Sequence, residues 1–172
     1  AAEAKGVRVL ICHVLRYTPF FTTIKGLLDA GAIGDICSVN HTECVGLVHQ
    51  SHSFVRGKWG NSGRSSCMLL QKSCHDLDIL QWLIGKKCTK VQSFGELSFF
   101  NREHMPEGAP EYCVQGCPAA DSCPYDARRI YLKDRMFSEH ATNKKNPTDE
   151  DILRAITETN YGRCVFQCDN DV

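Results

Sequence analysis

The segment from residue 101 to residue 123 sets the tightest limit on how this chain can fold, because it is rich in proline, glycine and cysteine and poor in large apolar side chains. Its densest part reads CVQGCPAADSCPY, residues 113–125, with three cysteines and two prolines. Such a segment cannot offset the conformational entropy lost on folding by burying its own apolar surface. We therefore expect a cross-link or a bound metal to hold this part of the chain.

Five cysteines are candidates for that metal site. Thiolates are soft ligands, and four of them around a tetrahedral ion form the common structural zinc site, although four cysteines also hold iron–sulfur clusters. The spacing is that of neither a zinc ribbon nor a ferredoxin. We favour a structural zinc ion, with an iron–sulfur cluster as the alternative, and disulfides or free thiols stay open. The candidate ligands are Cys113, Cys117, Cys123, Cys164 and Cys168.

Length and charge balance narrow the class of protein. The chain has 172 residues, of which 42% are hydrophobic, so it can bury one sizeable core. Twenty basic residues balance twenty acidic ones, which leaves no electrostatic footprint for nucleic acid or a membrane surface. No run approaches the roughly 18 apolar residues of a membrane span, and the N-terminus lacks a signal-peptide pattern. We expect a soluble, cytoplasmic protein with neither a nucleic-acid nor a membrane partner.

Three segments have the pattern of β-strands. Residues 6–13 form a nearly continuous apolar run, which is typical of a strand buried on both faces. Residues 35–45 alternate between two faces, and residues 87–100 are a further long candidate. The stretch from 46 to 64 is polar and has no clear period, so we expect a loop there that is either functional or mobile.

Helices are signalled by their caps. Thr18 can cap a helix that begins at Pro19. Residues 68–84 predict a second, largely apolar helix, which the following glycine stops. Thr148 resembles the N-cap of a shorter helix near the C-terminus.

The second helix carries a polar motif. Gln71, His75 and Asp78 are spaced by four and three residues, so a continuous helix would place them on one side. A histidine with a carboxylate one turn away is a candidate general acid or base. An ordinary His–Asp pair on a helix surface has the same spacing, so spacing alone leaves both interpretations open.

Two longer stretches resemble a known family. RYTPFFTTIKGLLDAGAIGDICSVNHTE, residues 16–43, has an arginine, two residues, a proline, a helix and then Gly-x-Ile-Gly before a strand. SSCMLLQKSCHDLDILQWLIGKKCTKVQSFG, residues 65–95, has a helix with His, two residues, Asp and a closing Leu-x-Gly. Over roughly residues 7–100 the chain resembles the glucose–fructose oxidoreductase / inositol dehydrogenase family, also called Gfo/Idh/MocA.

The resemblance implies a two-domain NAD(P)-dependent oxidoreductase of CH–OH donors. In this family a Rossmann domain binds NAD or NADP, and a C-terminal domain binds a sugar, cyclitol or related polyol. The implied fold class is α+β: an open, largely antiparallel or mixed sheet with helices packed on one face, plus an irregular Cys-rich insertion at 101–147. Residues 1–17 would be the last strand of the nucleotide domain and the junction. Residues 18–172 would be a truncated substrate and oligomerisation domain, in a homo-oligomer.

The resemblance also implies residue roles. His75 would transfer the proton of the hydroxyl being oxidised, and Asp78 would orient the substrate or the histidine. The expected substrate-binding residues, on the cofactor side or lining the cleft, are Arg16, Gln71, His49 and His52.

The chain departs from the family pattern in two ways. The family commonly has Asp and Gly where this chain has Gln71 and Ser73. Because an amide cannot act as a base, the proton network would be rebuilt, with Lys72 as the candidate. The chain also contains neither Gly-x-Gly-x-x-Gly nor the family's Glu-Lys-Pro motif with its catalytic lysine. We expect that this chain by itself neither binds the cofactor tightly nor turns over a substrate. The alternative function is a non-catalytic small-molecule-binding or sensor module with a structural metal site.

Overall fold

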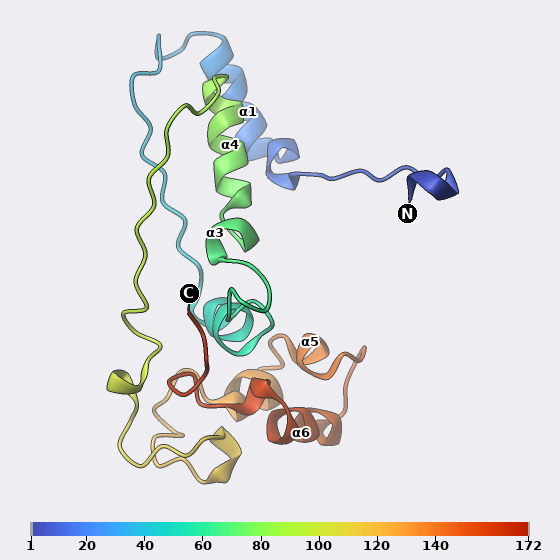
Figure 1. The fold of residues 1–172 in the computed structure, drawn as a ribbon, viewed down its shortest axis with the longest axis vertical. Coiled ribbons are helices and arrows are strands. Elements are labelled where there is room, and N and C mark those ends of the chain that lie inside the picture. The colour runs from blue at the N-terminus through green and yellow to red at the C-terminus, as the bar shows by residue number, and fades with distance from the viewer. Residues whose placement is uncertain (1, 172) are drawn as a thin grey trace. The chain divides into compact units, whose positions relative to one another are not determined.

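The computed structural model describes residues 2–171, which divide into two compact units. We call residues 2–43 with 72–92 the helix-pair unit, and residues 44–71 with 93–171 the core unit. Figure 1 shows the order of their elements by colour along the chain.

The helix-pair unit is built on two helices that pack side by side (Figure 1), α1 (Pro19–Asp29) and α4 (Cys74–Ile84). As predicted, Thr18 caps α1: its side chain accepts a hydrogen bond from the backbone N–H of Phe21 at 3.4 Å. Gly85 ends α4 in the left-handed conformation at φ 71°, which glycine adopts without a steric penalty. Two short 3-10 turns complete the helical part of this unit, Glu3–Lys5 and Val14–Tyr17.

The core unit consists of short helices and turns. Its longest helix is α6 (Asp149–Glu158), which Thr148 and Asp151 cap reciprocally, as the sequence predicted for Thr148. The other α-helices are α2 (Leu47–His49), α3 (Met68–Gln71) and α5 (Ser138–Thr142). Wider π-helical turns span Gln50–Arg56 and Arg128–Lys133, and 3-10 turns span Arg102–His104, Cys113–Gln115 and Asn160–Gly162.

Two apolar clusters stabilise the core unit. In the first, Ile152 and Ile156 of α6 pack with Ile130 and Tyr131 of the second π-helical turn, and all four are essentially fully buried. The second cluster gathers Val55, Cys164, Val165 and Phe166. The main core therefore lies in the part of the chain that includes the Cys-rich segment.

The predicted sheet is not found in residues 2–171, so the expectation of an α+β fold with an open, largely antiparallel or mixed sheet and helices on one face was wrong. Only an isolated antiparallel bridge, Tyr112 to Arg163, occurs there. The three strand candidates run extended, and among the described residues no backbone hydrogen bond joins one to another. Their side chains are open to solvent, with Leu10 92% and Phe94 91% exposed. A strand needs a neighbour that takes its hydrogen bonds, and alternation in the sequence does not supply one.

The helix predicted over residues 68–84 is also divided. It stops after Gln71, turns at Lys72 and Ser73, and resumes at Cys74 as α4. Ser73 has ψ near 1°, outside the helical range, which breaks the alignment of successive turns. Within the described part of the chain, no helix is both long and apolar enough to cross a membrane.

Candidate functional site

In the helix-pair unit, Arg16 makes a two-point contact with Asp78. The Arg16 guanidinium donates through Nε to Asp78 Oδ2 at 2.7 Å and through Nη2 to Oδ1 at 2.5 Å. This two-point geometry is the strong form of a carboxylate–arginine pair. The hydrogen bond from Arg16 holds the pKa of Asp78 below its usual range, against a smaller opposing effect of burial. Asp78 is thus a fixed carboxylate.

His75 lies one turn before Asp78 on α4. Its Nδ1 atom is buried and has no hydrogen-bond partner among the described residues. The neighbouring aromatic group is His13, whose ring meets that of His75 edge to face at 6.0 Å between centroids. His13 Nε2 also lies 3.9 Å from Asp78 Oδ1. The arrangement leaves one imidazole nitrogen of His75 without a protein partner, one helical turn before the Asp78 carboxylate.

Lys72 and Gln71, the other candidates near the motif, do not join His75 and Asp78 on one face of a helix. Lys72 forms an ion pair with Glu43 at 2.5 Å, so its ammonium already has an acidic partner. His41, on the extended segment, bonds Asp76 of α4 at 2.8 Å. Gln71 ends α3 and belongs to the core unit, beyond the break in the predicted helix. A single helical face carrying Gln71, His75 and Asp78 is therefore not formed.

The structure brings His49 and His52 together in a cavity of about 450 Å³ in the core unit. His52 is 4% exposed and its ring is stacked between Phe137, at 4.4 Å, and Tyr161, at 5.0 Å. Its Nδ1 shares a hydrogen bond of 2.9 Å with Tyr131 Oη. Burial, helped by the nearby charges of His140, His49 and Arg56, lowers the pKa of His52 to about 4. His52 is accordingly neutral at physiological pH.

The rest of this cavity combines aromatic faces with polar groups. Lys58 lies over the ring of Trp59, with Nζ 4.7 Å from its centroid. We call it the histidine cavity; the lining residues that the sequence analysis did not select include Lys58, Trp59, His140, Asn143 and Tyr161. They come from two chain segments about 80 residues apart, 58–59 and 140–161. Local sequence patterns do not predict that such distant segments contact each other.

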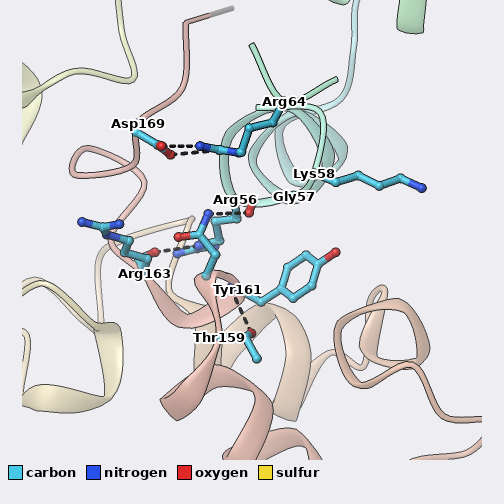
Figure 2. Close-up of a pocket in the computed structure, with 9 residues that line it drawn as sticks. Arg56, Gly57, Lys58, Arg64, Thr159, Tyr161, Arg163 and Asp169 are labelled. Atoms are coloured by element: carbon cyan, nitrogen blue, oxygen red, sulfur yellow. Dashed lines mark hydrogen bonds and ion pairs between the residues drawn. The ribbon is translucent and has the colours of Figure 1, made fainter. Parts of the chain in front are cut away.

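A second cavity of about 450 Å³, drawn in Figure 2, adjoins the first through Lys58 and Tyr161. In Figure 2 Arg64 faces Asp169 across two ion-pair contacts, of 2.5 and 3.1 Å, while Lys58 extends away from the other side chains. Arg163 is paired with Glu111 at 3.1 Å. Because the arginines of this cavity already pair with carboxylates or backbone carbonyls, we interpret the cavity as a structural contact between chain segments of the core unit and not as a ligand site.

Four of the five candidate metal-binding cysteines line one small cavity of the core unit. These are Cys113, Cys117, Cys123 and Cys164, and Cys168 is outside that lining. As the side chains stand, no group of three or more His, Cys, Asp or Glu within residues 2–171 could hold a metal ion.

Comparison with known proteins identifies the class. Residues 25–165 match the family model described as "Oxidoreductase family, C-terminal alpha/beta domain", the Gfo/Idh/MocA C-terminal domain. The match covers most of the chain, so the chain belongs to this oxidoreductase family, as its sequence motifs predicted. The family description names an α/β domain, whereas the described residues form no sheet.

The chain is also similar to one curated protein. The chain is 29% identical over 133 residues to "Putative oxidoreductase YteT" of Bacillus subtilis (strain 168). The alignment covers 74% of this chain but only 30% of that relative, so the chain spans about a third of its length. No solved structure matches the chain.

Proposed function

We propose that the chain is the substrate-binding part of an NAD(P)-dependent oxidoreductase that interconverts a hydroxyl and a carbonyl on a sugar, cyclitol or related polyol. The observation that carries the proposal is the His75 imidazole, whose Nδ1 has no partner among the described residues and which lies one turn of α4 before Asp78, the carboxylate that Arg16 holds. Membership of the oxidoreductase family supplies the reaction class.

In this proposal His75 handles the proton. When a CH–OH group is oxidised, its hydroxyl proton must leave as the carbonyl forms, and a neutral imidazole nitrogen at hydrogen-bond distance can accept it. The Asp78 carboxylate stabilises the resulting imidazolium, and Arg16 keeps Asp78 ionised and oriented. Arg16 is then a positioning residue rather than a direct substrate ligand.

The described residues do not fit the dinucleotide itself. A pyrophosphate is usually held by backbone N–H groups of a glycine-rich loop at a helix N-terminus. Here the N-termini of α1 and α6 are closed by the side chains of Thr18 and Thr148, and neither follows such a loop. In this proposal the cofactor is bound by another domain of the full-length protein.

Within the core unit, taken by itself, the histidine cavity has a lining that suits a polyol. Sugars and cyclitols present apolar C–H faces, which pack on aromatic rings, and hydroxyls, which need several donors and acceptors. Trp59 and Tyr161 offer the rings, and His49, His140 and Asn143 offer the polar groups. His52 and Phe137 hold this lining in place by stacking.

The test is a dehydrogenase assay on the full-length protein with a panel of sugars, cyclitols and polyols and with NAD and NADP. Loss of a general acid or base typically lowers the rate by about 10²–10⁴-fold, so His75→Ala should reduce kcat by that factor with KM little changed. His104→Ala, at an exposed histidine of the core unit, is the matched control and should keep wild-type kcat.

Two outcomes would count against the proposal. Full activity of His75→Ala would remove His75 from the proton transfer. Binding of a polyol by calorimetry without any reduction of NAD or NADP would instead favour the non-catalytic binding or sensor module.

A further inference from the structure

Four thiols converge on one cavity of the core unit. Cys113, Cys117 and Cys123 come from the Cys-rich segment, and Cys164 comes from the segment after α6. The backbone ties these segments together, because Cys164 N–H donates to Glu111 O at 2.8 Å. The cavity has a volume of about 20 Å³, which is on the order of the room that a single water-sized sphere needs. The space suits one ion.

A buried cation faces these thiols. Arg56 is 2% exposed, and its guanidinium donates to the carbonyls of Arg163 and Tyr125, each at 2.7 Å (Figure 2 shows the first). A third contact runs from Nη2 to Cys113 Sγ at 3.5 Å, and Nη1 has no partner among the described residues. A buried charge is costly unless an opposite charge compensates it.

No carboxylate in the described residues fills that role for Arg56. Asp126 lines the same cavity, but both of its oxygens accept hydrogen bonds from Arg128, at 3.1 and 2.8 Å. Negative charge on the sulfurs would supply what Arg56 lacks, because an Nη–H already points at Cys113.

We propose that Cys113, Cys117, Cys123 and Cys164 bind one structural zinc ion, with Arg56 as the neighbouring counter-charge. On binding, four thiols release four protons to solvent, and the resulting zinc tetrathiolate carries two negative charges, of which Arg56 balances one. All four thiols already line the cavity, and zinc binding would require their sulfurs to move together around one ion.

Cys168 is excluded from the set. It does not line the small cavity, and its thiol donates to the Cys164 carbonyl at 3.4 Å. Cys168 therefore provides a control at the same end of the chain.

The experiment measures metal on the purified full chain by emission spectrometry and then replaces the metal with cobalt(II). We expect one zinc per chain, and intense visible bands of tetrahedral cobalt with thiolate ligands. Serine in place of Cys113, Cys117, Cys123 or Cys164 should lower zinc content by more than about tenfold at a fixed low concentration of a competing chelator. Cys168→Ser, and Cys37→Ser at an exposed thiol, should keep the full content.

A second measurement covers variants that fail to fold. Wild-type chain is alkylated with and without prior removal of zinc, and the modified cysteines are located by mass spectrometry. The proposed four should be protected only while zinc is bound. Absence of bound zinc, iron with an equal amount of sulfide, disulfides among the four, or loss of zinc in Cys168→Ser but not in Cys164→Ser would each overturn the proposal.

Discussion

His52 shows how surroundings can remove the ordinary pH response of a histidine. Its pKa is about 4 in the folded chain against 6.5 for an unperturbed side chain, chiefly because the ring is buried. Between those two values the unfolded chain binds the proton and the folded chain does not, so stability rises with pH across this window. Acidification from about pH 6.5 to about pH 4 should therefore cost the fold on the order of 2–3 kcal/mol through this residue alone.

The measurement is urea unfolding of wild type and His52→Phe at several pH values. The phenyl ring keeps the stacking between Phe137 and Tyr161 but does not titrate. The difference in unfolding free energy between the two proteins should shift with pH only between about 4 and 6.5. A difference that stays constant over that range would contradict a buried, neutral His52, and His104→Gln serves as the exposed control.

The Arg16–Asp78 pair gives a second prediction at the residue scale. Arg16→Met removes the main cause that lowers the pKa of Asp78, so this pKa should rise toward the ordinary aspartate value. The native pair contributes stability above the unfolded pKa of Asp and loses it as pH falls through the lower, folded value. Carboxyl titration by NMR measures the change.

The control for that titration is Lys25→Met. Lys25 forms an ion pair with Asp29 at 2.6 Å on the surface of α1. Such an exposed pair contributes little, and its loss should leave the titration of Asp78 unchanged. An unaltered Asp78 titration in Arg16→Met would mean that the contact does not persist in solution.

At the scale of elements, the backbone of Gly162 lies so close to the backbone of α6 that no residue with a Cβ atom would fit there. A Cβ atom there would lie 1.6 Å from the carbonyl oxygen of Ile156, so the turn after α6 packs directly against that helix. Gly162→Ala should destabilise the chain by about 3 kcal/mol or more, since backbone must move to admit the methyl group.

Gly26 offers the matched substitution within α1. Nothing lies within 4 Å of the position its Cβ would take, and alanine is the better helix former. Gly26→Ala should stabilise α1 by roughly 0.5–1 kcal/mol. Thermal unfolding of both variants checks the pair, and similar effects of the two would show that the close approach at Gly162 is wrong.

Elements with local caps could be predicted, and elements that depend on distant partners could not. Thr18 and Thr148 mark the starts of α1 and α6 because an N-cap is decided by residues within one turn. The extended residues 6–13, 35–45 and 87–98 have the composition of strands, but pairing depends on a neighbour elsewhere in the chain. The break at Lys72 and Ser73 likewise has no strong local signal, since neither residue is glycine or proline.

In the candidate sites too, residues close in sequence could be predicted, whereas contacts between distant residues could not. His75 and Asp78 could be selected because they lie one turn apart on a helix. The contact of Asp78 with Arg16, 62 residues away, and the histidine cavity depend on the tertiary fold. The four cysteines of the small cavity could be named from composition, while the choice of Cys164 over Cys168 required the structure.

Over the whole molecule, stability is distributed unevenly. The amides of Ile152 and Ile156 are hydrogen-bonded at α6 and fully buried, whereas residues 8–12 and 36–45 have no backbone hydrogen-bond partner among the described residues. Hydrogen exchange should therefore be slow in α6 and close to that of an unfolded peptide in the extended segments. Mass spectrometry of exchanged peptides checks this, and strong protection of residues 36–45 would show that they are paired in solution.

The chain crosses between its two units three times, after residues 43, 71 and 92. Each unit is thus made of two pieces, and the pieces alternate along the sequence. A single recombination event or a single proteolytic cut cannot separate one intact unit from the other. Exchange of one intact unit between related genes would need breakpoints at all three crossings.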